Sequence, residues 1–315
     1  NIRTSVVPGA YGESIVMRLL DPRSIQVKLE EIGIEPKLYK HIENSMRKLN
    51  GLILITGPTG SGKTTTLYAF LQKIYNPELK VITIEDPIEY HLKGITQTQV
   101  EKGYSFFEGL RAALRQDPDV IMLGEIRDPE TAKTAVESSL TGHLVFSTLH
   151  TNNAGGVIPR LIDLEVNPKT LVSSLTISMA QRLVRKLCVN CKKEVVPKEE
   201  DMALVRKIVS EATANGKDVG EWKEKINSPF MLYEAPGCPA CGGIGYKGRI
   251  GIFEAILTDE AIEKIIPENP SERDIKNISN KQGILDMRED GVLKALSGIT
   301  SLEEVRSVVY LEEEV

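Results

Sequence analysis

A glycine-rich motif that ends in lysine and threonine lies near residue 60. Residues 51–66 read GLILITGPTGSGKTTT, so an apolar stretch leads directly into Gly57-x-x-x-x-Gly62-Lys63-Thr64. Glycines accept backbone dihedrals that turn successive N–H groups toward one anion. A helix that starts near Lys63 points the positive end of its dipole at the same place. The pattern therefore predicts a site for the phosphates of a nucleoside triphosphate.

Each part of the motif has an expected role. Lys63 would reach the β- and γ-phosphates, and the Thr64 hydroxyl would hold Mg²⁺. A chance glycine-rich turn is the alternative, but the preceding strand LILIT and the helical spacing of Leu67, Phe70, Leu71 and Ile74 disfavour it. The residues predicted to bind the nucleotide are Gly57, Pro58, Thr59, Gly60, Ser61, Gly62, Lys63, Thr64 and Thr65.

Carboxylates follow two further apolar segments. The first segment, DVIMLGEIRD, has Glu125 just after the apolar stretch, where a carboxylate can ligate a metal-bound water or act as general base. A solvated glutamate at a strand end is the alternative for Glu125. The second segment, ITIEDPIE, contains Glu85, Asp86 and Glu89. Two of these three acids are expected to support metal or water, with Glu85 and Glu89 as the catalytic candidates.

Two histidines bracket the apolar segment LVFST. They are His143 and His150, two of only four histidines in the chain. A neutral histidine near a γ-phosphate can sense it or donate a hydrogen bond to it. A single histidine is more commonly structural, but two within one strand's length favour a functional reading. Both histidines are therefore predicted at the catalytic site.

All four cysteines fall in two pairs, Cys188-x-x-Cys191 and Cys238-x-x-Cys241. This spacing lets two thiolates of each pair bind one tetrahedral Zn²⁺, so the pairs together predict a structural Cys₄ zinc site. Disulfides are the alternative, which a cytoplasmic chain disfavours, and a thioredoxin-like redox centre needs only one pair. The separation of the pairs requires an inserted segment, about 195–235, to loop out between them.

The composition limits the classes of function. The chain has 315 residues, of which 41% are hydrophobic and 26% charged, with a formal net charge of -5 and a pI ≈ 5.6. Since no basic excess indicates a nucleic-acid surface, a helicase or DNA pump is disfavoured. No apolar run is long enough to span a bilayer and no signal peptide is visible, so a cytoplasmic protein is expected.

Apolar strands alternate with helical stretches through the middle of the chain. The alternation predicts an α/β fold with a mostly parallel sheet covered on both faces. The expected strands are 52–56, 80–85, 119–123 and 144–148, and the expected helices are 36–49, 63–75, 106–116, 130–140 and 168–186. Short helices are expected near 259–266, 271–280, 284–297 and 301–310. At the other end, residues 2–7 and 13–20 predict an antiparallel ribbon.

Together, these segments make the chain resemble the secretion ATPase superfamily of type II secretion and type IV pilus machines. The resemblance runs from the first residue to the last, with the motifs in the family's order and spacing. They are the phosphate loop GPTGSGKTTT, the acidic box ITIEDPIEY, the atypical Walker B segment LRQDPDVIMLGEIRD and the histidine box TGHLVFSTLHTN.

The resemblance implies a RecA-like P-loop ATPase core within a homo-hexameric ring. Such a ring uses ATP and Mg²⁺ and converts hydrolysis into motion of an inner-membrane platform protein, with a cytoplasmic adaptor as a second partner. The expected location is cytoplasmic and peripheral to the inner membrane through these partners, with neither nucleic-acid binding nor direct membrane insertion. Retraction-type pilus motors typically lack the four cysteines, so the zinc site favours the secretion and pilus-assembly branch.

The resemblance also assigns a role to two arginines of the N-terminal ribbon. The opening RTSVVPGAYGESIVMRLL resembles the end of the family's second N-terminal domain, where two arginines approach the nucleotide phosphates. Here they fall on Arg3 and Arg18. An arginine charge matches the charge that develops on transferring phosphoryl oxygens. A solvated arginine on a strand is the alternative without the motif.

The predicted domains follow from these assignments. Because the chain begins at Asn1 and enters strand-like sequence at once, we expect a fragment that lacks an upstream part. The predicted units are the end of a truncated N-terminal domain (1–20), a linker (21–35), the ATPase core (36–187), the tetracysteine zinc-binding subdomain (188–257) and a helical C-terminal subdomain (258–315).

Three functions compete for this architecture. The leading hypothesis is a mechanochemical ATPase that drives pilin or pseudopilin assembly, hence pilus extension or secretion. A DNA-translocating or DNA-uptake motor of the same superfamily is the second, and it would show stimulation by DNA and a basic channel. A nucleotide-gated scaffold that binds ATP with little turnover is the third.

Overall fold

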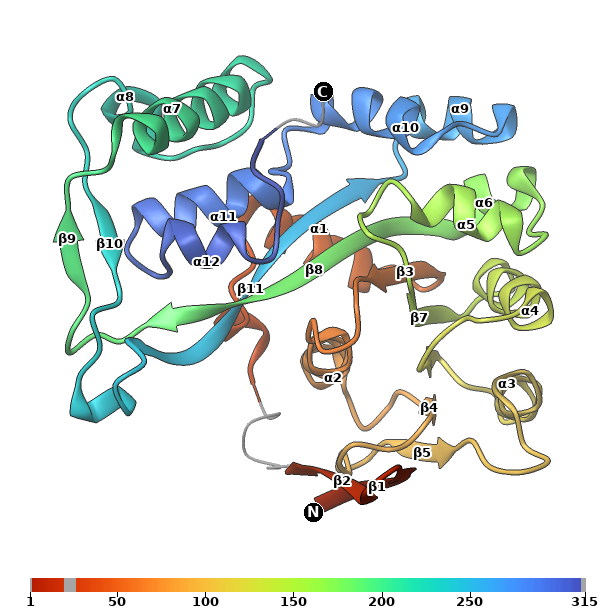
Figure 1. Ribbon diagram of the computed structural model, residues 1–315. Helices are drawn as coiled ribbons and strands as arrows, with labels where there is room; N and C mark the ends of the chain where they lie inside the picture. Colours follow the sequence, from red (N-terminus) through yellow and green to blue (C-terminus); the bar gives the residue numbers. More distant parts are fainter. Residues whose placement is uncertain (1, 20–26, 313–315) are drawn as a thin grey trace.

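One mixed sheet forms the centre of the molecule. The computed structural model describes residues 2–19 and 27–312 (Figure 1). The strand order is β11-β8-β3-β7-β6-β4-β5, and every neighbouring pair is parallel except β8 with β11. The strands are β3 (Gly51–Thr56), β4 (Val81–Glu85), β5 (Thr96–Gln99), β6 (Val120–Leu123), β7 (Leu144–Leu149), β8 (Leu175–Leu187) and β11 (Tyr246–Leu257).

Helices cover both faces of this sheet. Along β3, Leu52 and Leu54 belong to one apolar cluster and Ile53 and Ile55 to another, since successive side chains of a strand point to opposite faces. This double burial explains the uninterrupted apolar run LILI, and it confirms the predicted α/β class. The helices of this part are η2 (Leu29–Glu31), α1 (Pro36–Met46), α2 (Lys63–Ile74), α3 (Phe106–Leu114), α4 (Pro129–Leu140), α5 (Val157–Asp163) and α6 (Pro168–Ser174).

The predicted helix over 168–186 is wrong beyond its first turns. Helix α6 ends at Ser174, and β8 begins at Leu175 and pairs with β3 on one side and β11 on the other. The segment has apolar residues at both helical and alternating spacing, so its periodicity fits either structure. Pairing with two strands satisfies the backbone of β8 and decides the outcome.

The segment between the two cysteine pairs folds into its own elements. These are β9 (Lys193–Val195), α7 (Glu199–Ala214), α8 (Trp222–Lys225), β10 (Leu232–Glu234) and η3 (Pro239–Cys241). The predicted loop at about 195–235 therefore contains a helix, α7, whose residues Val205, Ile208 and Val209 share an apolar cluster with Val292 and Leu296. Strand β11, which falls within the predicted range 188–257, is the edge strand of the main sheet.

The C-terminal helices lie near their predicted positions. They are α9 (Glu260–Ile265), η4 (Ile266–Glu268), α10 (Glu272–Ser279), η5 (Asn280–Gln282), α11 (Met287–Leu296) and α12 (Leu302–Arg306). Four of these helices begin with an acidic or hydroxyl side chain that accepts a backbone N–H: Asp259 for α9, Ser271 for α10, Asp286 for α11 and Ser301 for α12. No helix among the described residues combines the length and the apolarity that a bilayer crossing requires.

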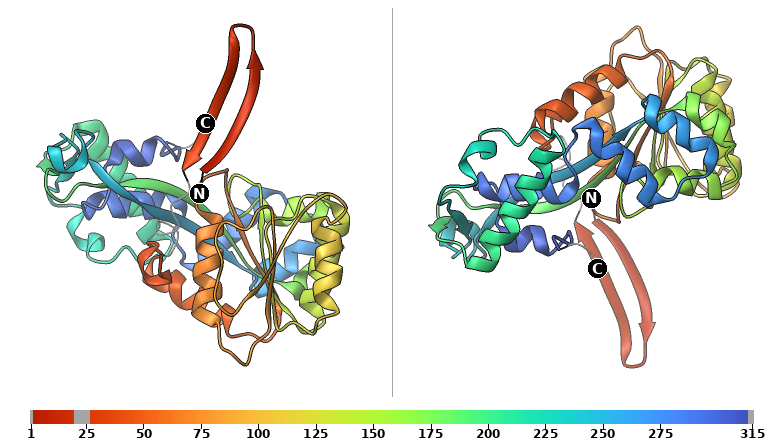
Figure 2. Two further views of the ribbon diagram at one scale, coloured as in Figure 1. Left: turned by 90° about the horizontal axis from the view of Figure 1, so that it is seen from below. Right: turned by 90° about the horizontal axis from the view of Figure 1, so that it is seen from above.

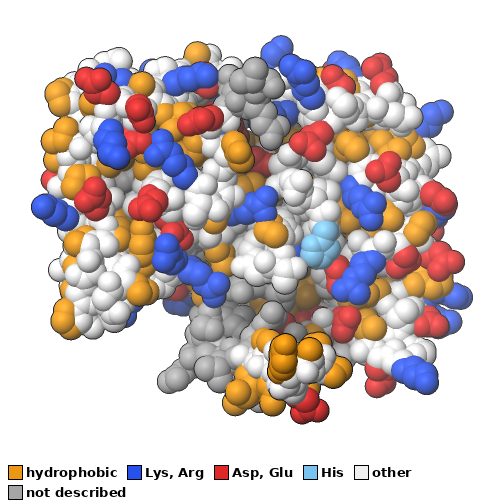
Figure 3. Space-filling model, viewed as in Figure 1, with side chains coloured by type: hydrophobic (Ala, Val, Ile, Leu, Met, Phe, Trp, Pro, Cys, Tyr) orange, Lys and Arg blue, Asp and Glu red, His pale blue; other side chains and the backbone are white. Residues whose placement is uncertain are grey.

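The N-terminal ribbon consists of β1 (Ile2–Gly9) and β2 (Gly12–Leu19), paired antiparallel as predicted. Both views of Figure 2 show it extending away from the rest of the chain. Its large apolar side chains are exposed, and Figure 3 shows them gathered at the lower edge of the molecule. The first part of the predicted linker, residues 21–26, lies outside the described residues.

Candidate nucleotide site and cysteine centre

The glycine-rich loop connects β3 to α2 at the carboxyl edge of the sheet. Gly57 has a φ of 144° and Gly62 a φ of 92°, both in the region that favours glycine. A Cβ at Gly57 would lie 2.5 Å from the carbonyl oxygen of Gln181, and one at Gly62 would lie 2.7 Å from Gln181 Nε2. The loop therefore packs directly against β8, and both positions require glycine.

Lys63 is the first residue of α2 and reaches back over the loop. Its Nζ donates to the carbonyl oxygens of Gly57, at 2.8 Å, and Pro58, at 3.1 Å. Burial lowers the pKa of Lys63, the Glu125 carboxylate opposes that change, and the charge of Arg182 adds to it. An anion bound by the loop would relieve this unfavourable environment, so the site fits the phosphates of a nucleotide.

Other residues of the loop are open to solvent. Pro58, Thr59 and Gly60 are exposed, as is Thr64 in the first turn of α2, whereas Ser61 is buried beneath them. The exposed positions are where a nucleotide and a metal ion could approach the loop. Thr64 carries a side-chain hydroxyl, and a hydroxyl oxygen is a ligand that Mg²⁺ accepts in such sites.

Glu125 lies just beyond the end of β6 and faces His150 just beyond the end of β7. His150 Nε2 is 3.2 Å from Glu125 Oε2, and Arg127 forms an ion pair with the other carboxylate oxygen. The hydrogen bond from Arg127 to this carboxylate raises the pKa of the arginine. The Glu125 side chain is 13% exposed, so a water or a phosphate could reach it from the solvent side. The structure thus brings Lys63, Glu125 and His150 to one edge.

Glu85, at the end of β4, is buried and its carboxylate is held by neutral donors. It accepts hydrogen bonds from the Tyr68 hydroxyl, from Thr83 Oγ1 at 2.6 Å and from Gln97 Nε2 at 3.0 Å. These bonds direct the carboxylate under α2 rather than toward the loop. Glu89, in the turn that follows, is half-buried.

His143 lies at the opposite end of β7 from His150. Its Nδ1 is 3.0 Å from the carbonyl oxygen of Ser138, at the end of α4. The six residues of β7 separate the two histidines, which is about 20 Å of strand. The expectation that both histidines share one site is therefore corrected: within one chain, only His150 of the two lies at the carboxyl edge of the sheet, beside Glu125.

Arg3 and Arg18 are opposite each other in the register of the N-terminal ribbon. Their side chains lie outside the described residues, so their proposed role in binding phosphate stays a prediction.

Two residues of the site were absent from the sequence predictions. Gln181 and Arg182 lie on β8, beside the glycine-rich loop. Gln181 Oε1 accepts a hydrogen bond from Thr66 Oγ1 at 2.8 Å, and Arg182 Nη2 donates to the carbonyl oxygen of Asn152 at 3.2 Å. The sequence analysis missed them because it predicted a helix over 168–186. Only as a strand paired with β3 does this segment bring Gln181 and Arg182 beside the loop that follows β3.

The four cysteines converge at the far ends of β8 and β11. The Sγ atoms of Cys188 and Cys238 are 3.9 Å apart, those of Cys191 and Cys241 are 3.9 Å apart, and those of Cys238 and Cys241 are 3.7 Å apart. A zinc ion with four thiolates at about 2.3 Å has sulfur–sulfur edges of about 3.8 Å. The four side chains therefore fit a tetrahedral zinc site with no position left open, as a structural site requires.

Backbone donors surround the sulfur of Cys241. The N–H groups of Cys238 and Gly245 both donate to it, each at 3.2 Å. Burial opposes ionisation of this thiol, but the backbone donors outweigh burial and lower the pKa of Cys241 to about 6. A thiolate is the form that ligates a metal, so the backbone prepares this residue as a ligand.

A strand, a glycine-rich loop and a helix that begins with lysine, on a RecA-like sheet with a carboxylate at its carboxyl edge, define a P-loop nucleotide-binding protein. The chain belongs to the family described as type II/IV secretion system protein, whose model matches residues 1–307.

Individual relatives agree with this membership. The chain is 46% identical over 307 residues to the type IV pilus assembly ATPase PilB of Thermus thermophilus, covering 97% of this chain and 33% of that protein. It is 44% identical over 311 residues to the type II secretion system ATPase E of Vibrio cholerae, covering 98% of this chain and 58% of the relative. The chain thus spans between a third and three fifths of these relatives.

Solved structures agree on the fold. The pilus retraction motor PilT with bound ADP superimposes with a TM-score of 0.65 at 28% identity, covering 98% of this chain and 74% of PilT. The ATPase DotB of Legionella pneumophila has the same TM-score of 0.65 at 22% identity, over 98% of this chain and 72% of DotB, and shows the fold alone.

Proposed function

We propose that this chain is the motor part of a hexameric ATPase that powers the assembly of a pilus or pseudopilus. The observation that carries the proposal is the convergence of Lys63, Glu125 and His150 at the carboxyl edge of the sheet. Family membership supports it, because the relatives are named as a pilus assembly ATPase and a type II secretion ATPase.

The residues of the loop divide the work of binding and catalysis. The N–H groups of residues 57–65 and the ammonium of Lys63 bind the triphosphate. Bound at Thr64 with carboxylate support from Glu89 through water, Mg²⁺ would neutralise charge on the β- and γ-phosphates, whereas the hydrogen bonds of Glu85 hold its carboxylate away from the loop. Glu125 orients the attacking water and takes its proton, and His150 holds the Glu125 carboxylate in place.

The ribbon supplies the link between nucleotide state and movement. Arg3 and Arg18, which are opposite each other in the register of β1 and β2, stabilise the phosphates. Hydrolysis removes the charge that they bind, so the ribbon and the core change their relative orientation with each turnover.

The cysteine centre and the partners complete the proposal. Cys188, Cys191, Cys238 and Cys241 hold one structural zinc ion, which favours the secretion and pilus-assembly branch over retraction motors. The ring works in the cytoplasm beside the inner membrane, through a platform protein and a cytoplasmic adaptor.

Steady-state ATP turnover by the purified chain tests the proposal. Lys63→Ala removes the ammonium from the loop and should reduce kcat/KM for ATP by about 10²-fold or more. Lys73→Ala is the matched control, since Lys73 lies on the same helix with its side chain 36% exposed and pairs with Glu30. Equal turnover by the wild type and Lys63→Ala would refute the site.

A further inference from the structure

A short segment after β7 connects the nucleotide edge with the C-terminal helices. We name residues 150–156 the bridging loop. It begins at His150, which faces Glu125, and continues to Thr151. Thr151 N donates to Thr56 Oγ1 at 2.7 Å, and the two hydroxyl oxygens are 2.9 Å apart. Thr56 directly precedes Gly57, so the first half of the bridging loop is fixed to the base of the phosphate-binding loop.

The second half of the bridging loop is fixed to different elements. Ala154 N donates to Glu254 Oε1 of β11 at 2.7 Å, and the Asn153 side-chain amide donates to Glu272 of α10. The carbonyl oxygen of Ala154 accepts from Ser178 Oγ of β8 at 3.2 Å. Among these contacts, the bond from Ala154 N to Glu254 ties the backbone of the bridging loop to the edge strand of the main sheet.

Glu254 has a second partner on the C-terminal side. Its Oε2 accepts from the N–H of Met287, the first residue of α11, at 3.4 Å. One carboxylate therefore connects the bridging loop to the amino end of a buried helix. That helix end carries the positive part of the helix dipole, which favours a negative group at this position.

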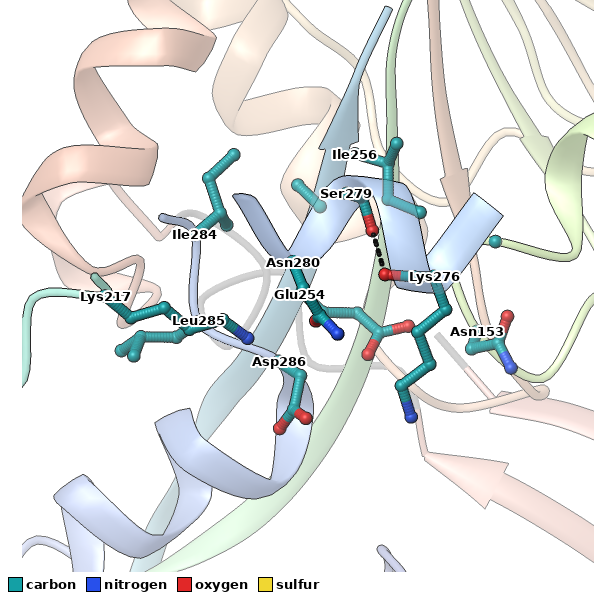
Figure 4. Close-up of a pocket in the computed structure, with 12 residues that line it drawn as sticks. Asn153, Lys217, Glu254, Ile256, Lys276, Ser279, Asn280, Ile284, Leu285 and Asp286 are labelled. Atoms are coloured by element: carbon teal, nitrogen blue, oxygen red, sulfur yellow. Dashed lines mark hydrogen bonds between the residues drawn. The ribbon is translucent and has the colours of Figure 1, made fainter. Parts of the chain in front are cut away.

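The surroundings of Glu254 are polar and charged. Glu254 lines a cavity of ≈ 50 Å³. Figure 4 shows its side chain with Asn153 on one side and Lys217 on the other. Burial raises the pKa of Glu254, the backbone donor Ala154 opposes this, and the nearby Asp286 charge adds to it. Burying a carboxyl group costs free energy, which the hydrogen bonds from Ala154 N and Met287 N offset.

We propose that Glu254 is a positioning residue for nucleotide hydrolysis: it holds the bridging loop so that His150 stays against Glu125, and it passes movements of that loop to α11. The inference rests on the proposed ATPase function and adds a residue that touches neither nucleotide nor metal. Its effect is transmitted through two hydrogen bonds, from Ala154 N and from Met287 N.

Kinetics of three variants test the inference. Glu254→Ala removes both acceptors, and we expect kcat to fall about tenfold or more while KM for ATP changes by less than about twofold, because the phosphate-binding loop is intact. Glu254→Gln keeps an oxygen that can accept from Ala154 N, so it should restore kcat to within about threefold of the wild type. Glu263→Ala, at an exposed glutamate of α9, is the control and should match the wild type.

Hydrogen exchange at the Ala154 amide supplies a readout that is independent of turnover. We expect faster exchange at Ala154 in Glu254→Ala, and near-wild-type exchange in Glu254→Gln. An unchanged kcat in Glu254→Ala would overturn the inference, as would a loss of kcat in Glu254→Ala without faster exchange at Ala154.

Two further outcomes keep the test decisive. If Glu254→Ala does not fold, Glu254→Asp replaces it: the shorter side chain withdraws the carboxylate, and unchanged kcat and unchanged exchange at Ala154 would overturn the inference. If the wild type binds ATP without turning it over, the proposed function fails. The positioning role in hydrolysis then fails with it, and transmission from the bridging loop to α11 is tested separately: a non-hydrolysable ATP analogue should alter exchange at the Met287 amide in the wild type but not in Glu254→Ala, and an equal effect in both would overturn this part as well.

Discussion

Charged side chains differ between two regions of the molecule. The nucleotide edge comprises residues 57–65, Glu125 and His150. The cysteine half comprises residues 188–241 and the helices α11 and α12, which pack against α7. At the nucleotide edge, Lys63 donates to the carbonyl oxygens of its own loop, and Glu125 contacts the exposed side chains of Arg127 and His150. In the cysteine half, the ion pair of Lys217 with Glu289 is buried at 2% and 4% exposure. The first region keeps its charges available to a ligand, whereas the second satisfies them internally, which is typical of a structural region.

The same difference extends to the two sites themselves. The loop of residues 57–62 lies partly exposed at the edge of the sheet. The four cysteines, in contrast, point at one another with all Sγ atoms within 4.8 Å. Strand β8 connects the two regions, since Gln181 packs against the loop and Cys188 directly follows the strand. A single strand therefore borders the candidate nucleotide site and leads, at its other end, to one of the proposed zinc ligands.

The largest effect is expected at the nucleotide edge. Glu125→Gln keeps the shape of the side chain but loses its ability to take a proton from water. Turnover should fall by about 10²- to 10⁴-fold while ATP still binds. Glu137→Gln, at an exposed glutamate of α4, should have wild-type activity. Turnover assays with a fluorescent-nucleotide binding measurement check both, and an active Glu125→Gln protein would remove the proposed difference between the two regions.

The buried ion pair should give the next largest effect. Lys217→Met leaves Glu289 without its partner and should lower the free energy of unfolding by about 3–5 kcal/mol. Lys264→Met, which breaks the exposed pair of Lys264 with Glu260, should change it little. Denaturant titrations measure both variants. Equal losses of unfolding free energy in Lys217→Met and Lys264→Met would contradict the claim that the buried ion pair stabilises the cysteine half more than an exposed pair does.

The pH dependence of the Lys217→Met protein sharpens this prediction. Burial and the Asp286 charge raise the pKa of Glu289, and Lys217 opposes them. Without Lys217 the folded-state pKa rises further above the unfolded value, so stability is retained at low pH and lost as pH rises through the folded pKa. The loss relative to wild type should therefore be smaller near about pH 5 than near about pH 8. Urea titrations of both proteins at the two pH values measure this difference. A loss of unfolding free energy that is the same at both pH values would contradict this account.

A smaller effect on activity is expected from the cysteines. Cys188→Ser should reduce the zinc content from about one ion per chain to less than about 0.2, and should lower the melting temperature. KM for ATP should change by less than about twofold, because the loop remains intact. Val189→Ser, at an exposed neighbour, is the control. Metal analysis of the purified proteins checks the content, and undiminished zinc in Cys188→Ser would overturn the Cys₄ assignment.

Local signals made much of the nucleotide site predictable. Glycines, lysine and threonine at fixed spacing define a loop whose geometry depends on its own backbone, and apolar runs located β3, β4, β6 and β7. The failures came from long-range effects. Periodicity could not distinguish strand from helix in residues 175–187, because pairing with β3 and β11 decides that segment. His143 and His150 are close in sequence, yet a strand places its two ends far apart.

The surroundings of the buried carboxylates Glu85 and Glu254 could not be predicted from the sequence either. Glu85 follows an apolar strand just as Glu125 does, and only the positions of Tyr68, Thr83 and Gln97 reveal that its carboxylate is directed inward. Glu254 lies in a strand that no motif marks, and its bond to Ala154 spans 100 residues of sequence. Contacts of this kind depend on the tertiary fold and leave no local pattern.

A structure of the protein with Mg²⁺ and a non-hydrolysable ATP analogue tests the central claim most directly. We predict that Lys63 Nζ leaves the carbonyl oxygens of Gly57 and Pro58 and contacts the β- and γ-phosphates, with Mg²⁺ at Thr64 and a water between Glu125 and the γ-phosphate. An analogue bound elsewhere, or no bound analogue under conditions in which calorimetry detects no uptake, would contradict the account.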